Sequence, residues 1–180
     1  MHRPDLTALP TAAAPARFRR VPVLRKPGRD VAVVAALQIL CFLILTRLEP
    51  RFFIIHLYQM IPYATILLLV GYSLDRWAYA IGGLASLVWL TLAHMAGLLG
   101  SAVERLRTHG NSDTTANLVA VLALTTAVMA VLMTVLWRVH WVKERSKPQA
   151  NRRIFFLSLA IVAVYYIVLL RWFWDMIRDA

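Results

Sequence analysis

Residues 52–74, FFIIHLYQMIPYATILLLVGYSL, decide the fold of this 180-residue chain. The stretch contains no charged side chain. At about 1.5 Å rise per residue, a helix of this length matches a hydrocarbon core about 30 Å thick. Lipid offers no partner for an unpaired backbone N–H or C=O group, so such a stretch crosses a bilayer as a helix. The sequence therefore predicts a transmembrane helix here.

Four more stretches share this length and apolar character. The chain is 60% hydrophobic with a mean hydropathy of +0.63, outside the range of a soluble domain. A chain of this size cannot cover five apolar helices with a polar shell. We therefore expect an all-α, polytopic transmembrane helix bundle over residues 31–180, with no room for an extramembrane enzyme. Its spans are predicted at 31–48, 52–74, 77–100, 115–137 and 154–173.

The N-terminal segment, residues 1–30, has a different composition. Five prolines interrupt it, at positions 4, 10, 15, 22 and 27, and few large apolar residues are present to build a core. We predict a disordered, basic, cytoplasmic tail. The small-residue run Thr11–Ala14 is too short and polar for the core of a secretory signal. An Arg-rich, acid-poor organellar transit peptide is the alternative interpretation.

The distribution of basic residues predicts the orientation. With five spans, residues 1–30, the turn at Arg76 and the loop 138–153 share one side and carry fourteen Lys and Arg. The other side carries six. The positive-inside rule then places the N-terminus in the cytoplasm and the C-terminus outside, as in a bacterial inner membrane.

The net charge of +11 also indicates a partner. The basic residues flank apolar spans and are not interleaved with exposed aromatic residues, so a nucleic-acid groove is not expected. Anionic lipid headgroups suit this pattern, at about 1 kcal/mol per basic residue near the surface.

The connections and helix ends follow from local sequence. Asp30 is expected to cap the first helix and Ser112 or Asp113 the fourth, because their side chains accept N–H groups at a helix start. The third connection, 101–114, is expected to continue the third helix in part. The fourth connection, 138–153, is expected to be the longest loop.

Small residues in the third stretch predict close helix packing. Gly82, Ser86 and Gly97 lie at helical spacing with neighbouring alanines, which lets other backbones approach. The third helix is therefore expected to be central. In the second stretch, Pro62 removes a backbone hydrogen bond and frees the carbonyl of Tyr58, which predicts a kink.

Polar residues inside the spans are the candidate functional residues. With the N-terminus inside, they converge in the outer half of the bundle, and a polar residue at this depth faces a partner helix or a cavity. Two interpretations are open: an outward-opening pocket, or hydrogen bonds between helices. The pocket would be formed by Gln38, Gln59, Tyr63, Thr91, Glu104, Asn117 and Tyr165.

Three functional hypotheses follow, and none includes a catalytic residue. The first is a non-catalytic accessory or structural subunit that packs against other membrane subunits or itself. The second is a redox subunit that binds b-type haem through His56 and His94, the two histidines within the predicted spans. The third is a small lipid- or quinone-handling protein that uses the outer polar pocket. The single cysteine, Cys41, excludes an internal disulfide and any multi-cysteine metal site, so a haem iron is the one metal considered.

Overall fold

The computed structural model describes residues 28–108, 113–143 and 148–178, and the side chains within these ranges except at 148 and 174–178. These ranges are helical and contain no strand. Of the predicted disordered tail, 1–30, residues 1–27 lie outside the described residues, and residues 29 and 30 already belong to the first helix. The elements are α1 (Arg29–Leu48), η1 (Pro50–Phe52), α2 (Phe53–Gly71), α3 (Asp75–Met95), α4 (Leu98–Thr108), α5 (Thr114–Lys143) and α6 (Pro148–Arg178).

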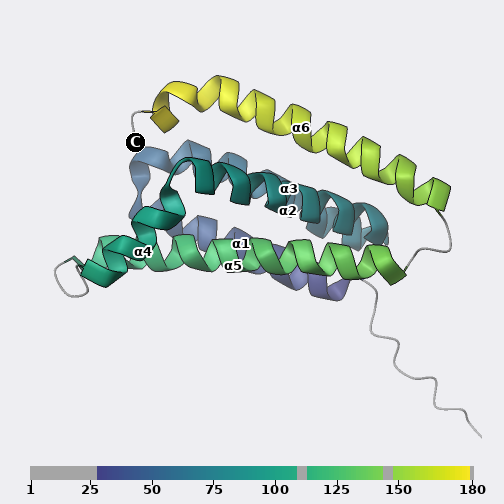
Figure 1. Ribbon diagram of the computed structural model, residues 1–180, viewed down its shortest axis with the longest axis horizontal. Helices are drawn as coiled ribbons and strands as arrows, with labels where there is room; N and C mark the ends of the chain where they lie inside the picture. The colour runs from purple at the N-terminus through teal and green to yellow at the C-terminus, as the bar shows by residue number, and fades with distance from the viewer. Residues whose placement is uncertain (1–27, 109–112, 144–147, 179–180) are drawn as a thin grey trace, which may run out of the picture.

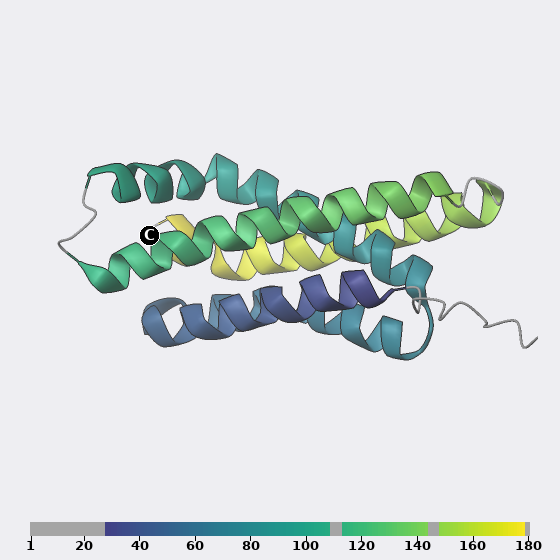
Figure 2. The same cartoon turned by 90° about the horizontal axis from the view of Figure 1, so that it is seen from below.

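The five long helices run in alternating directions along one another (Figure 1). We call the end of the bundle where α1 begins the proximal end, and the opposite end the distal end. The α2–α3 turn, the end of α5 and the start of α6 are proximal, whereas η1 and α4 are distal. In Figure 2, α4 extends the distal end, and it packs against α5. All five long helices are long and apolar enough to span a membrane, as the sequence predicts.

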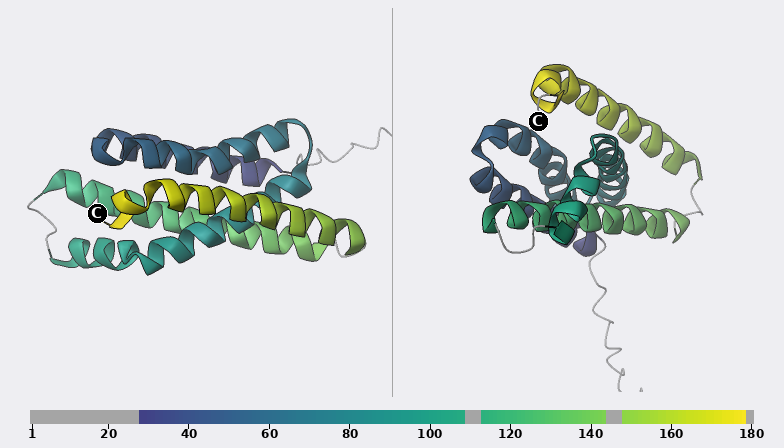
Figure 3. Two further views of the ribbon diagram at one scale, coloured as in Figure 1. Left: turned by 90° about the horizontal axis from the view of Figure 1, so that it is seen from above. Right: turned by 60° about the vertical axis from the view of Figure 1, so that its left-hand side comes forward.

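Helix α3 is the centre of the bundle. It contacts each of the other five α-helices, and the end-on view in Figure 3 shows it surrounded by them. In its most apolar window, 61% of residues are buried, against 22–44% in the other four spans. The small residues Gly82 and Ser86 are among the buried ones. Their lack of bulk lets neighbouring helices approach, which is how helices associate where lipid is as apolar as their side chains.

Of the two glycines of α3, Gly83 is approached more closely by a neighbouring helix. A Cβ atom built on Gly83 would lie 2.5 Å from the Cγ atom of Trp137 on α5. At Gly82 the nearest atom is the Sδ of Met133, at 3.0 Å. A methionine side chain is flexible and can yield, whereas the contact at Gly83 includes the Cβ of Trp137 at 2.6 Å. Gly83 therefore fixes the distance between α3 and α5.

The third span is shorter than predicted, because a turn at Gly97 separates α3 from α4. The prediction placed the span at 77–100, but α3 ends at Met95 and α4 is a separate helix. Gly97 has φ +72°, a left-handed conformation that ends helices and favours glycine. The sequence also predicted close helix packing at Gly97, which the structure does not show. Gly97 is exposed, and no atom lies within 4 Å of an added Cβ.

The predicted fourth loop, 138–153, is largely helical instead. Helix α5 continues to Lys143 and α6 already begins at Pro148, so only 144–147, which lie outside the described residues, separate them. Residues 138–143 contain no glycine or proline, and nothing in them breaks the helix. Proline fits the first position of a helix because its missing N–H would have no intrahelical partner there.

The expected helix caps are partly realised. At α5, the Asp113 carboxylate accepts hydrogen bonds from the N–H groups of Thr115 and Ala116 at 3.1 and 3.2 Å, as predicted. At α1, Asp30 lies in the first turn and accepts the N–H of Val31 at 3.0 Å. The N-cap position belongs to Gly28, in a left-handed conformation.

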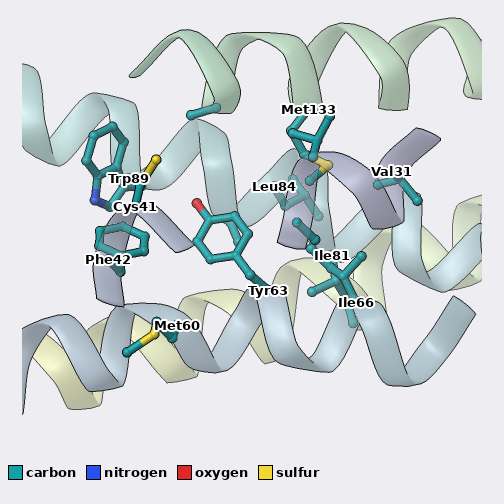
Figure 4. Close-up of a cluster of buried hydrophobic side chains, with 14 of the residues drawn as sticks. Val31, Cys41, Phe42, Met60, Tyr63, Ile66, Ile81, Leu84, Trp89 and Met133 are labelled. Carbon is teal, nitrogen blue, oxygen red and sulfur yellow. The ribbon is translucent and has the colours of Figure 1, made fainter. Parts of the chain in front are cut away.

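Aromatic side chains join α1, α2 and α3 in the distal half of the core. The Phe42 ring lies 6.0 Å from the Tyr63 ring and 6.4 Å from the Trp89 ring, measured between centroids. Figure 4 shows these three rings around Cys41, with the Tyr63 hydroxyl pointing into the bundle. Ring pairs at such distances add packing energy beyond the area they bury.

The contact at Gly83 gives the first prediction. In Gly83→Ala the added methyl group must displace Trp137, so we expect destabilisation by about 1–3 kcal/mol, the usual cost of overpacking. The measurement is thermal unfolding in detergent. Gly100→Ala is the matched control, because no atom lies within 4 Å of its added Cβ and α4 should gain helix propensity. Equal melting temperatures for the two variants would contradict the close approach of α5.

Candidate functional site

His56 and His94, the candidate haem ligands, lie in different surroundings. His56 is partly buried, with its ring centroid 6.2 Å from that of Phe42 and 6.5 Å from that of Phe52. Its Nδ1 atom lies 3.4 Å from Gln59 Oε1, and its Nε2 atom 3.6 Å from Glu49 Oε2. Both ring nitrogens of His56 thus face nearby oxygen atoms at the α1–α2 connection. His94 is exposed at the end of α3.

Three further residues of the predicted pocket lie towards the distal end. Thr91 and Glu104 are exposed, on α3 and α4. The Thr91 hydroxyl donates a hydrogen bond to the Leu87 carbonyl of its own helix at 2.9 Å. Asn117, near the start of α5, is half-buried.

Gln38 and Tyr63 lie at the centre of the bundle, and there they meet Ser86. All three are fully or almost fully buried, on α1, α2 and α3. The Gln38 Nε2 atom donates a hydrogen bond to the Thr126 carbonyl of α5 at 3.4 Å. The Tyr63 hydroxyl lies near the Ser86 and Gln38 side chains. Gln38 Oε1, Tyr63 Oη and Ser86 Oγ make no hydrogen bond of standard geometry with a described group.

Tyr165 satisfies the carbonyl that Pro62 leaves free. Its hydroxyl, on α6, donates a hydrogen bond to the Tyr58 carbonyl on α2, four residues before the proline. The neighbouring Tyr166 donates to the Ala85 carbonyl of α3 at 3.0 Å. An unpaired carbonyl in an apolar environment is costly, so the two tyrosines hold α6 to α2 and α3.

A second group of polar residues gathers at the proximal end, and sequence reasoning missed it. The Tyr79 hydroxyl, on α3, donates a hydrogen bond to the Asp30 carboxylate on α1. The Tyr79 ring stacks on the His140 ring of α5, with centroids 4.0 Å apart and planes 12° from parallel. We call Asp30, Tyr79 and His140 the proximal polar cluster. It joins three helices.

A pocket of about 330 Å³ opens beside this cluster. Asp75 and Arg76, at the start of α3, contribute charges of both signs, and His140 contributes its imidazole. The remaining wall is partly apolar, with an indole ring from Trp77. The lining residues are Ser73, Leu74, Asp75, Arg76, Trp77, His140 and Ile154.

The turn between α2 and α3 gives the pocket a defined shape. Ser73 has φ +59°, with its N–H bonded to the Val70 carbonyl at 3.0 Å, and the Leu74 N–H reaches the Leu69 carbonyl at 2.8 Å. This pattern is the Schellman ending of a helix. The Asp75 carboxylate packs against Gly28, where an added Cβ would lie 2.2 Å from Asp75 Oδ1.

The proximal polar cluster had a signal in the sequence. When consecutive helices alternate in direction, one end of the bundle contains Asp30, Asp75 and the end of the fourth span. His140 was assigned to a loop because the apolar run stops near Trp137, whereas α5 continues past it. Which of these side chains touch depends on the position of α5 along α3, which periodicity does not specify.

The chemistry of these sites is hydrogen bonding and charge pairing. Among the described residues, no group of three or more His, Cys, Asp or Glu side chains is placed to hold a metal ion. Comparison with protein-family models, with curated proteins and with solved structures finds no match to this chain.

The contact between Tyr165 and Tyr58 gives the second prediction. We expect Tyr165→Phe to destabilise the bundle by about 0.6–1.7 kcal/mol, the range of interhelical hydrogen bonds in membranes. In a Pro62→Ala background, the restored N–H can bond the Tyr58 carbonyl, so Tyr165→Phe should cost less than half as much. Thermal unfolding in detergent measures this double-mutant cycle.

Tyr72→Phe is the control for this cycle, because Tyr72 is 76% exposed at the end of α2. The same cost of Tyr165→Phe in both backgrounds would show that the Tyr165 hydroxyl does not replace the bond lost at Pro62.

Proposed function

We propose that this chain is a multi-pass protein of a bacterial inner membrane, acting without catalysis as an accessory or structural subunit. It packs against other membrane subunits or a second copy of itself. Its proximal end faces the cytoplasm. The proposal is supported by one observation, the hydrogen bonds that polar side chains form between helices.

Four polar side chains within the spans join helices to one another, whereas the threonines of the spans bond to carbonyls of their own helices. Gln38 bonds α1 to α5, Tyr165 bonds α6 to α2, and Tyr166 bonds α6 to α3. At the proximal end, Tyr79 bonds α3 to α1. A site that performs chemistry needs polar groups directed at a substrate, and these groups are directed at partner helices. This arrangement favours a scaffold over an enzyme.

Charge supports the proposed orientation. Among the described residues, the proximal end carries six basic side chains and two acidic ones, Asp30 and Asp75, and the distal end carries five basic and three acidic ones. The larger difference between the two sides comes from the basic residues of the N-terminal segment and of the loop at 144–147. Positive charge near the ends of spans favours the cytoplasmic side. The six proximal basic residues are Arg29, Arg76, Arg138, Lys143, Arg152 and Arg153.

Neither alternative hypothesis gains comparable support. For haem, His94 is exposed at the end of α3, whereas His56 is partly buried, with its Nδ1 atom 3.4 Å from Gln59 Oε1. For a lipid- or quinone-handling pocket in the outer half, the proposed lining residues point to different surroundings. A pocket of the described residues lies at the proximal end.

The third prediction concerns orientation. In a Cys41→Ala background, Arg107→Cys on α4 and Arg152→Cys on α6 are an exposed pair at opposite ends. We expect a membrane-impermeant maleimide added from the periplasmic side to label Arg107→Cys, and to label Arg152→Cys only after the inner membrane is permeabilised. The reverse pattern would overturn the orientation.

The fourth prediction concerns association. Two differently tagged copies are co-expressed, extracted in native nanodiscs and measured by native mass spectrometry. We expect either a complex of both tagged copies or a fixed-stoichiometry complex with one other subunit. A single monomeric species at every protein concentration would contradict a role as a packing subunit.

A further inference from the structure

Aromatic side chains join the end of α5 to the start of α6, which Figure 1 shows at the same end of the bundle. The ring centroids of Trp137 and Phe155 lie 6.2 Å apart, and those of Trp141 and Phe155 lie 5.9 Å apart. The Phe156 ring adjoins this cluster, 5.4 Å from Phe155, and is 63% exposed. These contacts fix how far α5 and α6 slide along each other.

Three exposed arginines border the aromatic cluster. Arg138 precedes Trp141 by three residues on α5, and Arg152 precedes Phe155 by three residues on α6. In a helix with 3.6 residues per turn, residues three apart lie about 60° apart around the axis. Each arginine is therefore next to a ring of the cluster on its own helix. We call Arg138, Arg152 and the adjacent Arg153 the α5–α6 arginine patch.

The patch faces away from the centre of the bundle. His140 of α5 stacks on Tyr79 of α3, and Ile154 of α6 lines the pocket at the α2–α3 turn. Arg138 and Arg152 each lie two residues before one of these, which is about 160° around the helix. All three arginines are exposed, and within the described part of the chain none of them forms an ion pair. Their guanidinium groups are thus available to an outside partner.

The levels of the arginines suit two phosphates. Phe155 contacts both Trp137 and Trp141, so it lies level with residue 139 of the antiparallel α5. Counted from this level, Arg138 and Arg152 are four residues apart along the bundle, or about 6 Å at a rise of 1.5 Å per residue. A guanidinium group binds a phosphate through two parallel hydrogen bonds. One such group on each helix, about one turn apart, therefore suits two phosphates on a short linker.

Apolar side chains continue from the patch towards the middle of the spans. Val131 lies seven residues before Arg138, and Leu159 lies seven residues after Arg152. Residues seven apart share a face of a helix, two turns apart. Val131, Leu159 and Phe156 are all exposed, and we call them the apolar strip. Basic and aromatic side chains at the end of an apolar span mark the level of lipid headgroups, so the strip lies where acyl chains run.

From this geometry we infer that the α5–α6 arginine patch binds cardiolipin, a phospholipid with two phosphates. One phosphate pairs with Arg138 and the other with Arg152 and Arg153, and acyl chains run along the apolar strip. Basic sites between transmembrane helices on the cytoplasmic side bind headgroups of this kind. The inference deepens the proposed function by naming a lipid partner, and it rests on the proposed insertion with the proximal end in the cytoplasm. No covalent step is involved.

The test uses the full chain in nanodiscs of phosphatidylcholine that contain cardiolipin and phosphatidylglycerol at equal phosphate content. Native mass spectrometry counts the lipids that stay bound. We expect preferential retention of cardiolipin, and about tenfold weaker retention in Arg138→Gln and in Arg152→Gln, because each loses a charge-assisted pair with a phosphate.

Lys143→Gln is the matched control, because Lys143 is an exposed basic residue at the same end of α5. It follows Arg138 by five residues, so it lies about 140° away around the helix. We expect it to retain cardiolipin like the parent chain. Equal loss of retention in Lys143→Gln and Arg138→Gln would overturn the inference, because general surface charge would then explain binding.

A second measurement is thermal unfolding in detergent with and without added lipid. A ligand that binds the folded state raises its melting temperature, so cardiolipin should stabilise the parent chain but not the double variant Arg138→Gln/Arg152→Gln. Without lipid both chains should melt alike, since the substituted side chains are exposed. Equal stabilisation by phosphatidylglycerol at matched phosphate would overturn the two-phosphate site. Equal stabilisation by inorganic phosphate would overturn the lipid as the source.

Failure of the proposed function gives a different result. A monomeric species in the native mass spectrum contradicts the packing role, whichever lipid is retained. Reversed maleimide labelling of Arg107→Cys and Arg152→Cys overturns the orientation. Correct labelling together with no preference for cardiolipin counts against the lipid site alone.

Discussion

The contact between Gly83 and Trp137 sets the position of α5 along α3, and the proximal end depends on it. The Trp137 side chain occupies the space that a Cβ at residue 83 would need. One turn nearer the proximal end on both helices, the His140 ring of α5 stacks on the Tyr79 ring of α3. Trp137 also stacks on Phe155, with planes 3° from parallel, which connects α6 to the same point. The absence of a side chain at Gly83 therefore allows α3, α5 and α6 to meet around Trp137.

The second constraint is that backbone carbonyls inside the bundle need hydrogen-bond donors, and the carbonyl freed by Pro62 is an example. Pro62 removes a bond from α2, and the Tyr58 carbonyl then binds the Tyr165 hydroxyl of α6. Because a freed carbonyl among apolar side chains has no other donor, the defect in one helix becomes a contact point for another. The central residues Gln38, Tyr63 and Ser86 are less completely paired.

Among the described side chains, basic residues outnumber acidic ones at both ends of the bundle. The proximal end has six basic and two acidic residues, and the distal end has five basic and three acidic residues. At the distal end, Arg105 and Asp113 form an ion pair at 3.5 Å. The two acidic residues of the proximal end lie at the starts of α1 and α3. Carboxylates are favourable at helix starts because the helix dipole is positive there.

The sequence by itself determined the class of fold, the five spans and the central place of α3, because apolar length and small-residue spacing are local properties. It also located the free carbonyl at Tyr58, since a proline acts on the residue four positions earlier. It misplaced the end of α3 and the loop 138–153, because apolar content marks the membrane segment and not the helix end. Only the tertiary structure decided that Tyr165 reaches Tyr58 and that Tyr79 meets Asp30 and His140. Those contacts depend on how far helices rotate and slide against one another, which side-chain packing sets and periodicity does not.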